Sequence, residues 1–391
     1  MKIITIIHCV FLNVLALIFL VACSSYPKIP VEGELFGKKI KTTVDSEIAR
    51  YYIEDYLQGK NSNPRLDKKI EKLYGSRNGG IPTREELKLV AEEYSVDFSA
   101  MYFADRLLEN EGNKNIQTTF DYFLENKGSA LTMLEKNAGS YVVLFVPGWD
   151  YIANGHLTGA DFAEPRRLVT VLGIENYLVE APSNGSVEDI ADYLTADLLK
   201  HSQTGKDIII VGASSAGPAI YLCLADKLKI SQKTNIKAWL NLGGILKGSP
   251  LIDHYQQWPQ SWLFGVVAWY NGWDIEKVYS MSSRISRNRF EKIDAINHNI
   301  LIVNYLGIPL SGQLSQYSKD KYLLLSSDGP NDGLTLLADV VVPNSLTIVA
   351  MGSDHFFAED PNINDKTIAL MKVVISYLRP GKIASAQNRI P

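Results

Sequence analysis

The segment from residue 208 to residue 221 constrains the fold of this chain more than any other. It reads IIIVGASSAGPAIY: an apolar run stops at Gly212, two serines follow, and an apolar pattern with helical spacing begins at once. A strand and a helix joined by so short a turn pass very close to each other, so only small residues fit beside the turn. Gly212, Ala216 and Gly217 meet this requirement. The segment therefore predicts a strand, a sharp turn that carries a serine, and a helix.

An acidic loop and a histidine follow further along the chain. Residues 322–334 read YLLLSSDGPNDGL, which we interpret as a short strand that leads into a loop containing aspartates. Residues 346–357 read LTIVAMGSDHFF, a second predicted strand that ends just before Gly352 and His355. Open parallel sheets place their sites just beyond the carboxyl ends of the strands. We therefore expect a serine, an aspartate and His355 to lie at one edge of a sheet.

These three residue types together indicate nucleophilic chemistry. A serine hydroxyl is a weak nucleophile unless a base accepts its proton. We expect Ser214 to be that nucleophile, because it stands where the turn follows the apolar run, with Ser215 as the alternative. The oxyanion formed by attack needs two preorganised N–H donors. We expect them to be the backbone N–H of Ser215 and that of Trp149, which follows the predicted strand 141–146 and Gly148.

His355 is the expected general base, because it follows a predicted strand and comes after the acidic loop. Asp332 is the expected acid that orients His355, because Gly333 and a new apolar stretch come directly after it. Asp328, in the same loop, is the alternative. We interpret Asp354 as a solvated residue or as a hydrogen-bond acceptor within its loop.

Residues from about 140 to 380 resemble the α/β-hydrolase superfamily, in the direction of lipases and esterases. The resemblance rests on the serine turn, on the loops NDG at 331–333 and GSDH at 352–355, and on LGGILKGSPL at 242–251, which is similar to a loop of many lipases. It implies an α/β-hydrolase fold with a mostly parallel sheet. It further implies a serine hydrolase that cleaves carboxylic esters through Ser214, Asp332 and His355 and an acyl-enzyme intermediate. The alanine that closes the serine turn leaves the subfamily open.

Strands and helices alternate from residue 139 to about 381, which is typical of a parallel sheet with helices on both faces. An aromatic-rich insertion at about 251–297 holds four of the six tryptophans. We interpret the insertion as a cap that either lines an acyl pocket or packs on its own core. Residues 45–138 read as a helical extension, and residues 382–391 as a C-terminal tail.

The N-terminus carries a targeting signal. A lysine and an apolar run precede Leu-Val-Ala-Cys23, which resembles the lipobox of bacterial lipoproteins. Residues 1–22 are then a cleaved signal peptide, Cys23 carries lipid, and residues 23–44 form a tether. The implied location is the bacterial cell envelope, at the outer membrane in a Gram-negative cell. A transmembrane anchor is the alternative, because the apolar run is about long enough to span a bilayer.

Composition narrows the range of partners. The formal net charge is −4 and no basic block stands out, so nucleic acid is not an expected partner. No cofactor or metal is expected, because no metal-ligand spacing is present, and Cys223 is expected to be a buried apolar residue. The expected partners are a small-molecule or lipid ester and, through Cys23, a membrane. Two alternatives remain: an acyltransferase that uses the same triad, and a non-catalytic envelope lipoprotein on a hydrolase scaffold.

Overall fold

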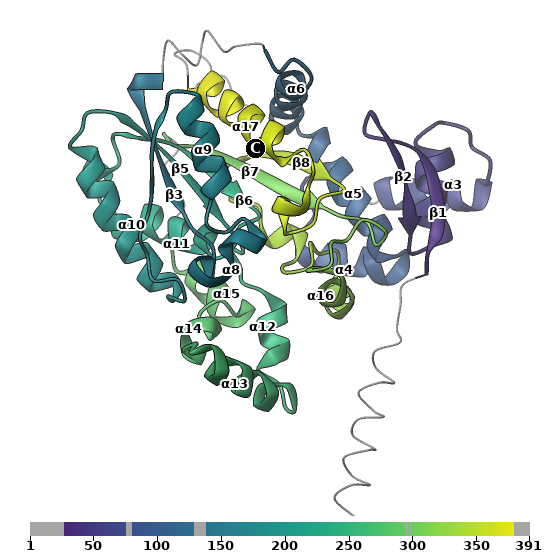
Figure 1. The fold of residues 1–391 in the computed structure, drawn as a ribbon. Coiled ribbons are helices and arrows are strands. Elements are labelled where there is room, and N and C mark those ends of the chain that lie inside the picture. The colour runs from purple at the N-terminus through teal and green to yellow at the C-terminus, as the bar shows by residue number, and fades with distance from the viewer. Residues whose placement is uncertain (1–26, 76–79, 129–137, 294–295, 297–298, 379–391) are drawn as a thin grey trace, which may run out of the picture.

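The computed structural model describes residues 27–75, 80–128, 138–293, 296 and 299–378. Its centre is a six-stranded sheet in the order β4-β3-β5-β6-β7-β8, and every neighbouring pair is parallel (Figure 1). The strands are β3 (Tyr141–Val146), β4 (Glu175–Leu178), β5 (Asp207–Ala213), β6 (Ile236–Leu242), β7 (Leu301–Ile308) and β8 (Leu346–Met351). Because the strands run in one direction, the loops at their carboxyl ends gather at one edge.

Helices cover both faces of this sheet. Alternate side chains of each strand point to opposite faces, so Val142 and Leu144 belong to one buried cluster, whereas Val143 and Phe145 belong to another. The first cluster is closed by α10 (Val187–Ser202) and α11 (Ala216–Leu222). The second is closed by α6 (Glu111–Glu125), α9 (Ala163–Val171) and α17 (Ile363–Tyr377). This arrangement is the α/β-hydrolase fold, so the predicted fold class is confirmed.

One predicted strand is wrong. The apolar run at residues 322–325 lies in a helix, α16 (Lys319–Leu325). Tyr322 and Leu325 are fully buried, and their spacing of three residues suits one face of a helix. The Tyr322 hydroxyl also donates to the buried Asp97 carboxylate at 3.1 Å. A run of four apolar residues fits either structure, and packing against the N-terminal region decides in favour of a helix.

The predicted tether is also wrong over residues 29–44, which form an antiparallel hairpin of β1 (Ile29–Leu35) and β2 (Lys38–Val44). Phe36 and Gly37 turn the chain with φ of 50° and 78°. Val31, Leu35 and Val44 are buried beneath the helices that follow. The signal for a strand was the alternation of these apolar residues with lysine and glutamate, which Pro30 and Gly33 obscured in the sequence.

The helices after the hairpin share their core with the sheet. They are α2 (Glu47–Tyr51), η1 (Tyr52–Tyr56), α3 (Pro64–Gly75), α4 (Arg84–Glu93), α5 (Val96–Glu109) and α6. A capping box of Thr83 and Glu86 opens α4. Phe98 and Phe103 of α5 pack in one cluster with Leu306 of β7 and Val349 of β8. The described part of the N-terminal region therefore shares its core with the six-stranded sheet.

Side chains of α6 cap the outer edge of β8, the last strand of the sheet. The backbone N–H of Thr347 donates to Asn113 Oδ1 at 2.7 Å, and that of Val349 donates to Gln117 Oε1 at 2.8 Å. An edge strand otherwise presents unpaired N–H groups that attract other strands. The amides of Asn113 and Gln117 thus take the place of a further strand.

The predicted cap is a helical insertion between β6 and β7. It comprises α12 (Pro250–Tyr255), α13 (Gln260–Asn271), α14 (Ile275–Tyr279) and α15 (Ser283–Glu291), and it projects from the sheet at the lower end of Figure 1. The remaining short elements are α8 (Tyr151–Thr158), η2 (Ala138–Ser140), η3 (Cys223–Lys227), η4 (Ile230–Gln232), η5 (Ser326–Asp328), η6 (Leu337–Asp339) and η7 (Phe357–Glu359). The predicted signal peptide, Cys23 and the tail at 382–391 lie outside the described residues. Within the described ranges, no helix is both long and apolar enough to cross a bilayer.

Candidate active site

The turn after β5 has the backbone that its sequence predicts. Ser214 lies in the left-handed region with φ of 54°, a conformation that costs a residue with a side chain about 1–2 kcal/mol. A Cβ at Gly212 would lie 2.2 Å from Ile220 Cδ1, and one at Gly217 would lie 2.6 Å from Gly244 Cα. Gly217 is therefore needed for the close approach of the helix and the neighbouring loop, and Gly212 leaves room for the Ile220 side chain beside the strand.

The two serines of the turn have different surroundings. Ser214 is partly exposed, whereas Ser215 is fully buried in ordinary helical backbone with φ of −61°. The Ser215 hydroxyl has no hydrogen-bond partner among the residues that the structure describes. Of the two serines, only Ser214 combines a left-handed backbone with a partly exposed side chain, which is the arrangement expected of the serine in a nucleophile elbow.

Asp332 and His355 are in direct contact. His355 Nδ1 lies 2.8 Å from Asp332 Oδ2, and Asp332 has no exposed surface. The other carboxylate oxygen, Oδ1, accepts the backbone N–H groups of Leu334 and Thr335 at 2.9 and 2.8 Å. The backbone N–H of His355 also donates to the backbone carbonyl of Asp332 at 2.8 Å. Because a carboxylate only accepts, the proton of neutral His355 is on Nδ1, and Nε2 is left as the basic nitrogen.

Asp328 and Asp354, the other aspartates of these two loops, contact other groups and not the His355 ring. Asp328 Oδ2 lies 3.3 Å from His254 Nε2, and Asp328 Oδ1 lies 3.9 Å from Arg84. Asp354 is buried and accepts the backbone N–H groups of Ser315 at 2.7 Å and Phe356 at 2.9 Å. Asp354 is thus the loop acceptor that the sequence allowed, and Asp332 is the aspartate in contact with His355.

Ser214 and His355 adjoin the same stretch of backbone at the end of β6. The Ser214 N–H donates to the Leu242 carbonyl at 3.1 Å. The next residue, Gly243, has φ of 57°, and a Cβ there would lie 3.6 Å from His355 Nδ1. In the described part of the chain, no hydrogen bond joins the side chains of Ser214 and His355. The structure therefore brings the acid and the base together and places the serine on the loop beside them.

Two backbone N–H groups near Ser214 are unused. A Cβ at Gly148 would lie 3.8 Å from Ser214 Cβ, so the loop after β3 passes directly beside the serine turn. The N–H groups that flank Trp149 are occupied, Gly148 by the Ala160 carbonyl and Asp150 by the Ser183 carbonyl. Among the hydrogen bonds of the described residues, none uses the N–H of Trp149 or of Ser215. These are the two donors that the sequence predicts for an oxyanion.

Several groups that position Asp332 and His355 cannot be recognised from the sequence, because they are backbone atoms. The N–H groups of Leu334 and Thr335 fix the Asp332 carboxylate, and the bare α-carbon of Gly243 leaves room for the Phe357 ring, since a Cβ there would lie 3.1 Å from Phe357 Cε2. Backbone amides act here irrespective of residue type, so sequence patterns do not mark them. The glycine at 243, within the lipase-like loop, was the one available hint.

Cys223 has the inert role expected of it. It is fully buried on η3 and contacts Thr195 Oγ1 at 3.1 Å. Burial raises the pKa of its thiol to about 12, so the reactive thiolate is scarce at neutral pH. Among the described residues, no group of three His, Cys, Asp or Glu side chains is arranged to hold a metal ion.

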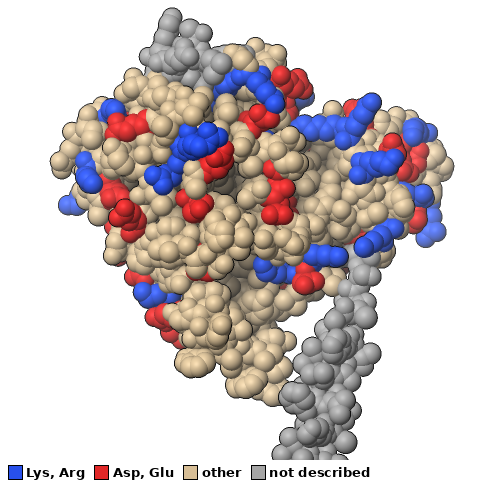
Figure 2. Space-filling model, viewed as in Figure 1, with Lys and Arg blue, Asp and Glu red and all other residues tan. Residues whose placement is uncertain are grey.

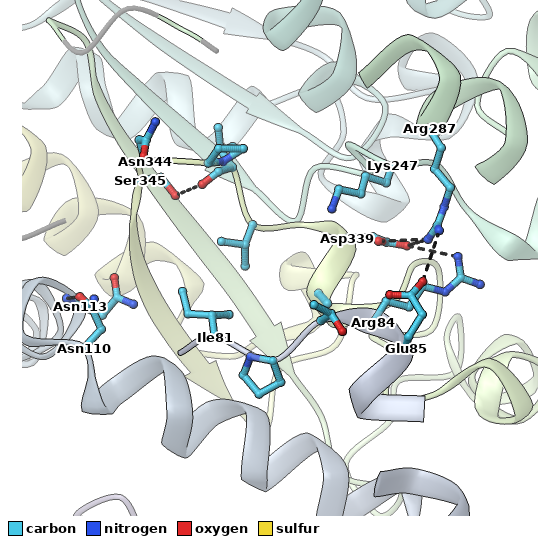
Figure 3. A pocket seen from close by; sticks show the side chains of 16 residues that line it. Ile81, Arg84, Glu85, Asn110, Asn113, Lys247, Arg287, Asp339, Asn344 and Ser345 are labelled. Carbon is cyan, nitrogen blue, oxygen red and sulfur yellow. Dashed lines mark hydrogen bonds and ion pairs between the residues drawn. The ribbon is translucent and has the colours of Figure 1, made fainter. Parts of the chain in front are cut away.

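A cleft of about 360 Å³ lies away from these residues, between the start of α4, the loop after β6 and η6 (Figure 3). Its cations converge on Asp339, which is almost fully buried. Arg287 Nη2 donates to Asp339 Oδ2 at 2.9 Å, and Arg84 Nη1 lies 3.8 Å from the same oxygen. Because Arg84 of α4 and Arg287 of α15 both contact Asp339 of η6, we interpret the cleft as a seam that joins the N-terminal helices to the cap and sheet.

No protein-family model and no curated protein matches this chain. Solved structures with a similar fold include the metagenomic carboxyl esterase MGS0156, which is 17% identical with a TM-score of 0.49 over 62% of this chain and 76% of that one. The mature lipase BlEst2 of Bacillus licheniformis is 20% identical, with a TM-score of 0.44 over 55% of this chain and 84% of that chain. Phospholipase PlaB of Legionella pneumophila is 17% identical, with a TM-score of 0.39 over 51% and 44%. Identities this low assign no activity to the present chain.

Proposed function

We propose that this protein is a serine hydrolase that cleaves carboxylic esters. The observation that carries the proposal is the buried Asp332–His355 pair at 2.8 Å, beside a serine turn whose backbone is strained at Ser214. A buried carboxylate that accepts the Nδ1 proton of a histidine leaves the basic Nε2 atom available to accept the proton of a nucleophile. The two unused N–H groups near Ser214 add the remaining component of acyl-transfer chemistry.

In the proposed mechanism, Ser214 Oγ attacks the ester carbonyl carbon while its proton passes to His355 Nε2. Asp332 holds the Nδ1 proton and stabilises the imidazolium. The N–H groups of Trp149 and Ser215 bind the oxyanion of the tetrahedral intermediate. His355 then gives its proton to the leaving alcohol and Ser214 carries the acyl group. Water, activated by His355, attacks the acyl-enzyme and releases the acid and Ser214.

We also propose that the protein is anchored to the bacterial cell envelope by lipid on Cys23. This proposal rests on the lipobox-like sequence alone, with the outer membrane as the expected site in a Gram-negative cell. Mass spectrometry of the protein isolated from membranes would test it. A diacylglyceryl modification at Cys23 supports the proposal, and an unprocessed N-terminus contradicts it.

Covalent labelling tests the nucleophile. A chain of residues 26–391 retains every described helix and strand. We expect a fluorophosphonate to add one label to it, seen as a single adduct by intact mass. Ser214→Ala should remove this adduct. Ser215→Ala is the matched control, because its buried hydroxyl makes no hydrogen bond and its loss breaks none.

Loss of the label only in Ser215→Ala would move the nucleophile by one residue and contradict the assignment of Ser214. Absence of label in the folded wild type, with and without detergent, would contradict catalysis and favour a scaffold. If labelling succeeds, esters of graded chain length identify the acyl group. Added alcohols then distinguish hydrolysis from transfer, because an acyltransferase yields the new ester instead of the free acid.

A further inference from the structure

The cap exposes large apolar side chains to solvent. Its outer surface, here called the cap face, includes Trp258, just before α13, and residues of α13 itself. Trp258, Trp269 and Tyr270 are more than 80% exposed, and Trp262 is 67% exposed. The remaining exposed apolar members are Leu263, Val266 and Val267. Exposed apolar surface of this extent is uncommon on proteins without an interaction partner and marks a site of association.

The cap face carries no charge. Residues 255–273 include no Asp, Glu, Lys, Arg or His. Figure 2 shows the consequence: the lower end of the molecule, where α13 lies, has neither basic nor acidic side chains on the visible face. Protein interfaces are also enriched in aromatic residues, but they usually add arginine and a polar rim. Tryptophan and tyrosine mixed with aliphatic residues are instead typical of a segment that lies at the boundary of a lipid bilayer.

The position of α13 in the fold agrees with this composition. β1, where the described chain begins, starts on the side of the molecule toward which the cap projects (Figure 1). Cys23 precedes Ile29 by six residues, a reach of about 20 Å in extended chain. A membrane to which Cys23 is attached is therefore close to this side. α13 has 12 residues, too few to span a bilayer but enough to lie in its surface.

We propose that the cap face docks on the surface of a lipid bilayer, with the tryptophans of α13 and Trp258 inserted at the headgroup boundary. The attraction comes from burial of apolar area and does not need anionic lipid, because the segment lacks cations. Trp273 packs edge-on against Trp149 with ring centres 6.3 Å apart. Docking thus brings the loop that contains Trp149, the candidate oxyanion donor, close to the membrane. The expected substrate class is then a lipid ester, an extension that rests on the proposed function.

Vesicle binding tests the docking surface without catalysis. Residues 26–391 with Ser214→Ala lack both the apolar N-terminal run and the proposed nucleophile, so neither contributes to the signal. We expect this protein to sediment with phosphatidylcholine vesicles, and its tryptophan fluorescence to be quenched by brominated phosphatidylcholine. Raising the salt concentration should leave binding unchanged, because no ionic contact is involved.

Replacing tryptophans of the cap face should weaken binding without unfolding the protein. We expect Trp262→Ser and Trp269→Ser each to reduce the vesicle partition coefficient roughly tenfold, and the double variant roughly 100-fold. Ile230→Ser is the matched control: Ile230 is 74% exposed but lies before β6, at the opposite end of the sheet from the cap. This control should bind as well as its parent.

Three results would overturn the proposal. The first is no sedimentation with phosphatidylcholine vesicles, and the second is equal loss of binding in Ile230→Ser. The third is a dimer of the parent protein in sedimentation equilibrium that becomes a monomer in the tryptophan variants, together with no binding to vesicles. The cap face would then be the interface between two copies of this chain. Fluorophosphonate labelling of the wild type in buffer reports on catalysis separately, so failure of docking and failure of the proposed activity are distinguishable.

Discussion

Replacing Ser214 with glycine should make the protein more stable while it removes the proposed nucleophile. Ser214 has φ of 54°, a region that glycine occupies freely and that other residues occupy at a cost. The surrounding structure holds it there: Gly148 and Gly217 let the neighbouring loops close around the turn. The strain is thus stored at the residue whose hydroxyl must be presented to substrate.

The expected gain is the difference of two opposing effects. Relief of the left-handed strain contributes about 1–2 kcal/mol. Glycine adds conformational freedom to the unfolded chain, which costs about 0.4–1 kcal/mol. The net stabilisation is therefore about 0.5–1 kcal/mol, a shift of about 1 °C in the unfolding temperature for a chain of this length. Ser214→Ala is the control, because alanine keeps the Cβ and hence the strain, and its stability should match the wild type.

Urea unfolding of the three proteins, followed by circular dichroism, measures the difference. Both variants should lack the fluorophosphonate adduct, and Ser214→Gly alone should unfold at higher urea. If Ser214→Gly is less stable than Ser214→Ala, the left-handed backbone does not store strain and the reasoning is refuted.

Three further outcomes test the site and its setting. Asp332→Asn should lower kcat for ester hydrolysis roughly 10³- to 10⁴-fold with the fold intact, because His355 loses its orienting carboxylate; a loss below tenfold contradicts the assignment. Gly217→Ala should destabilise by about 1–3 kcal/mol in urea, since its methyl meets Gly244 Cα at 2.6 Å, whereas Gly265→Ala, with open space, should be neutral or better. Burial and the nearby Asp45 carboxylate raise the pKa of Asp97 to about 7, so its protonated form favours the folded state. The stabilisation from protonated Asp97 is fully present below about pH 4 and is lost as pH rises through 7. A free energy of unfolding that rises steadily from pH 5 to 8, in wild type and Asp97→Asn alike, contradicts this prediction.

The serine turn was predictable because its constraint is local. Strand, small residues and helix are all visible within residues 208–221, and the structure has them as expected. The pairing of His355 with Asp332 instead of Asp328 was only a preference at the sequence level. It depends on how the loop folds back, with the N–H groups of Leu334 and Thr335 fixing one carboxylate oxygen, and such contacts leave no periodic pattern.

The errors arose where distant packing decides the local structure. Residues 322–325 fit a strand or a helix, and contacts with Asp97, more than 200 residues away in sequence, favour the helix. The hairpin at residues 29–44 is held by burial of Val31 and Leu35 under helices that a short sequence window does not include. Tertiary contacts override weak local preferences in both cases.

The amide caps on β8 have a consequence for how this chain can be shortened and how it folds. Asn113 and Thr347 are 234 residues apart in sequence, so α6 meets its partner strand only after nearly the whole chain has been synthesised. A fragment that begins at residue 139 would contain all six sheet strands and the proposed triad, which makes it an obvious unit to express. It would also leave the N–H groups of Thr347 and Val349 bare on an apolar edge, where a second fragment can add its own strand. The N-terminal helices thus protect the folded sheet against self-association.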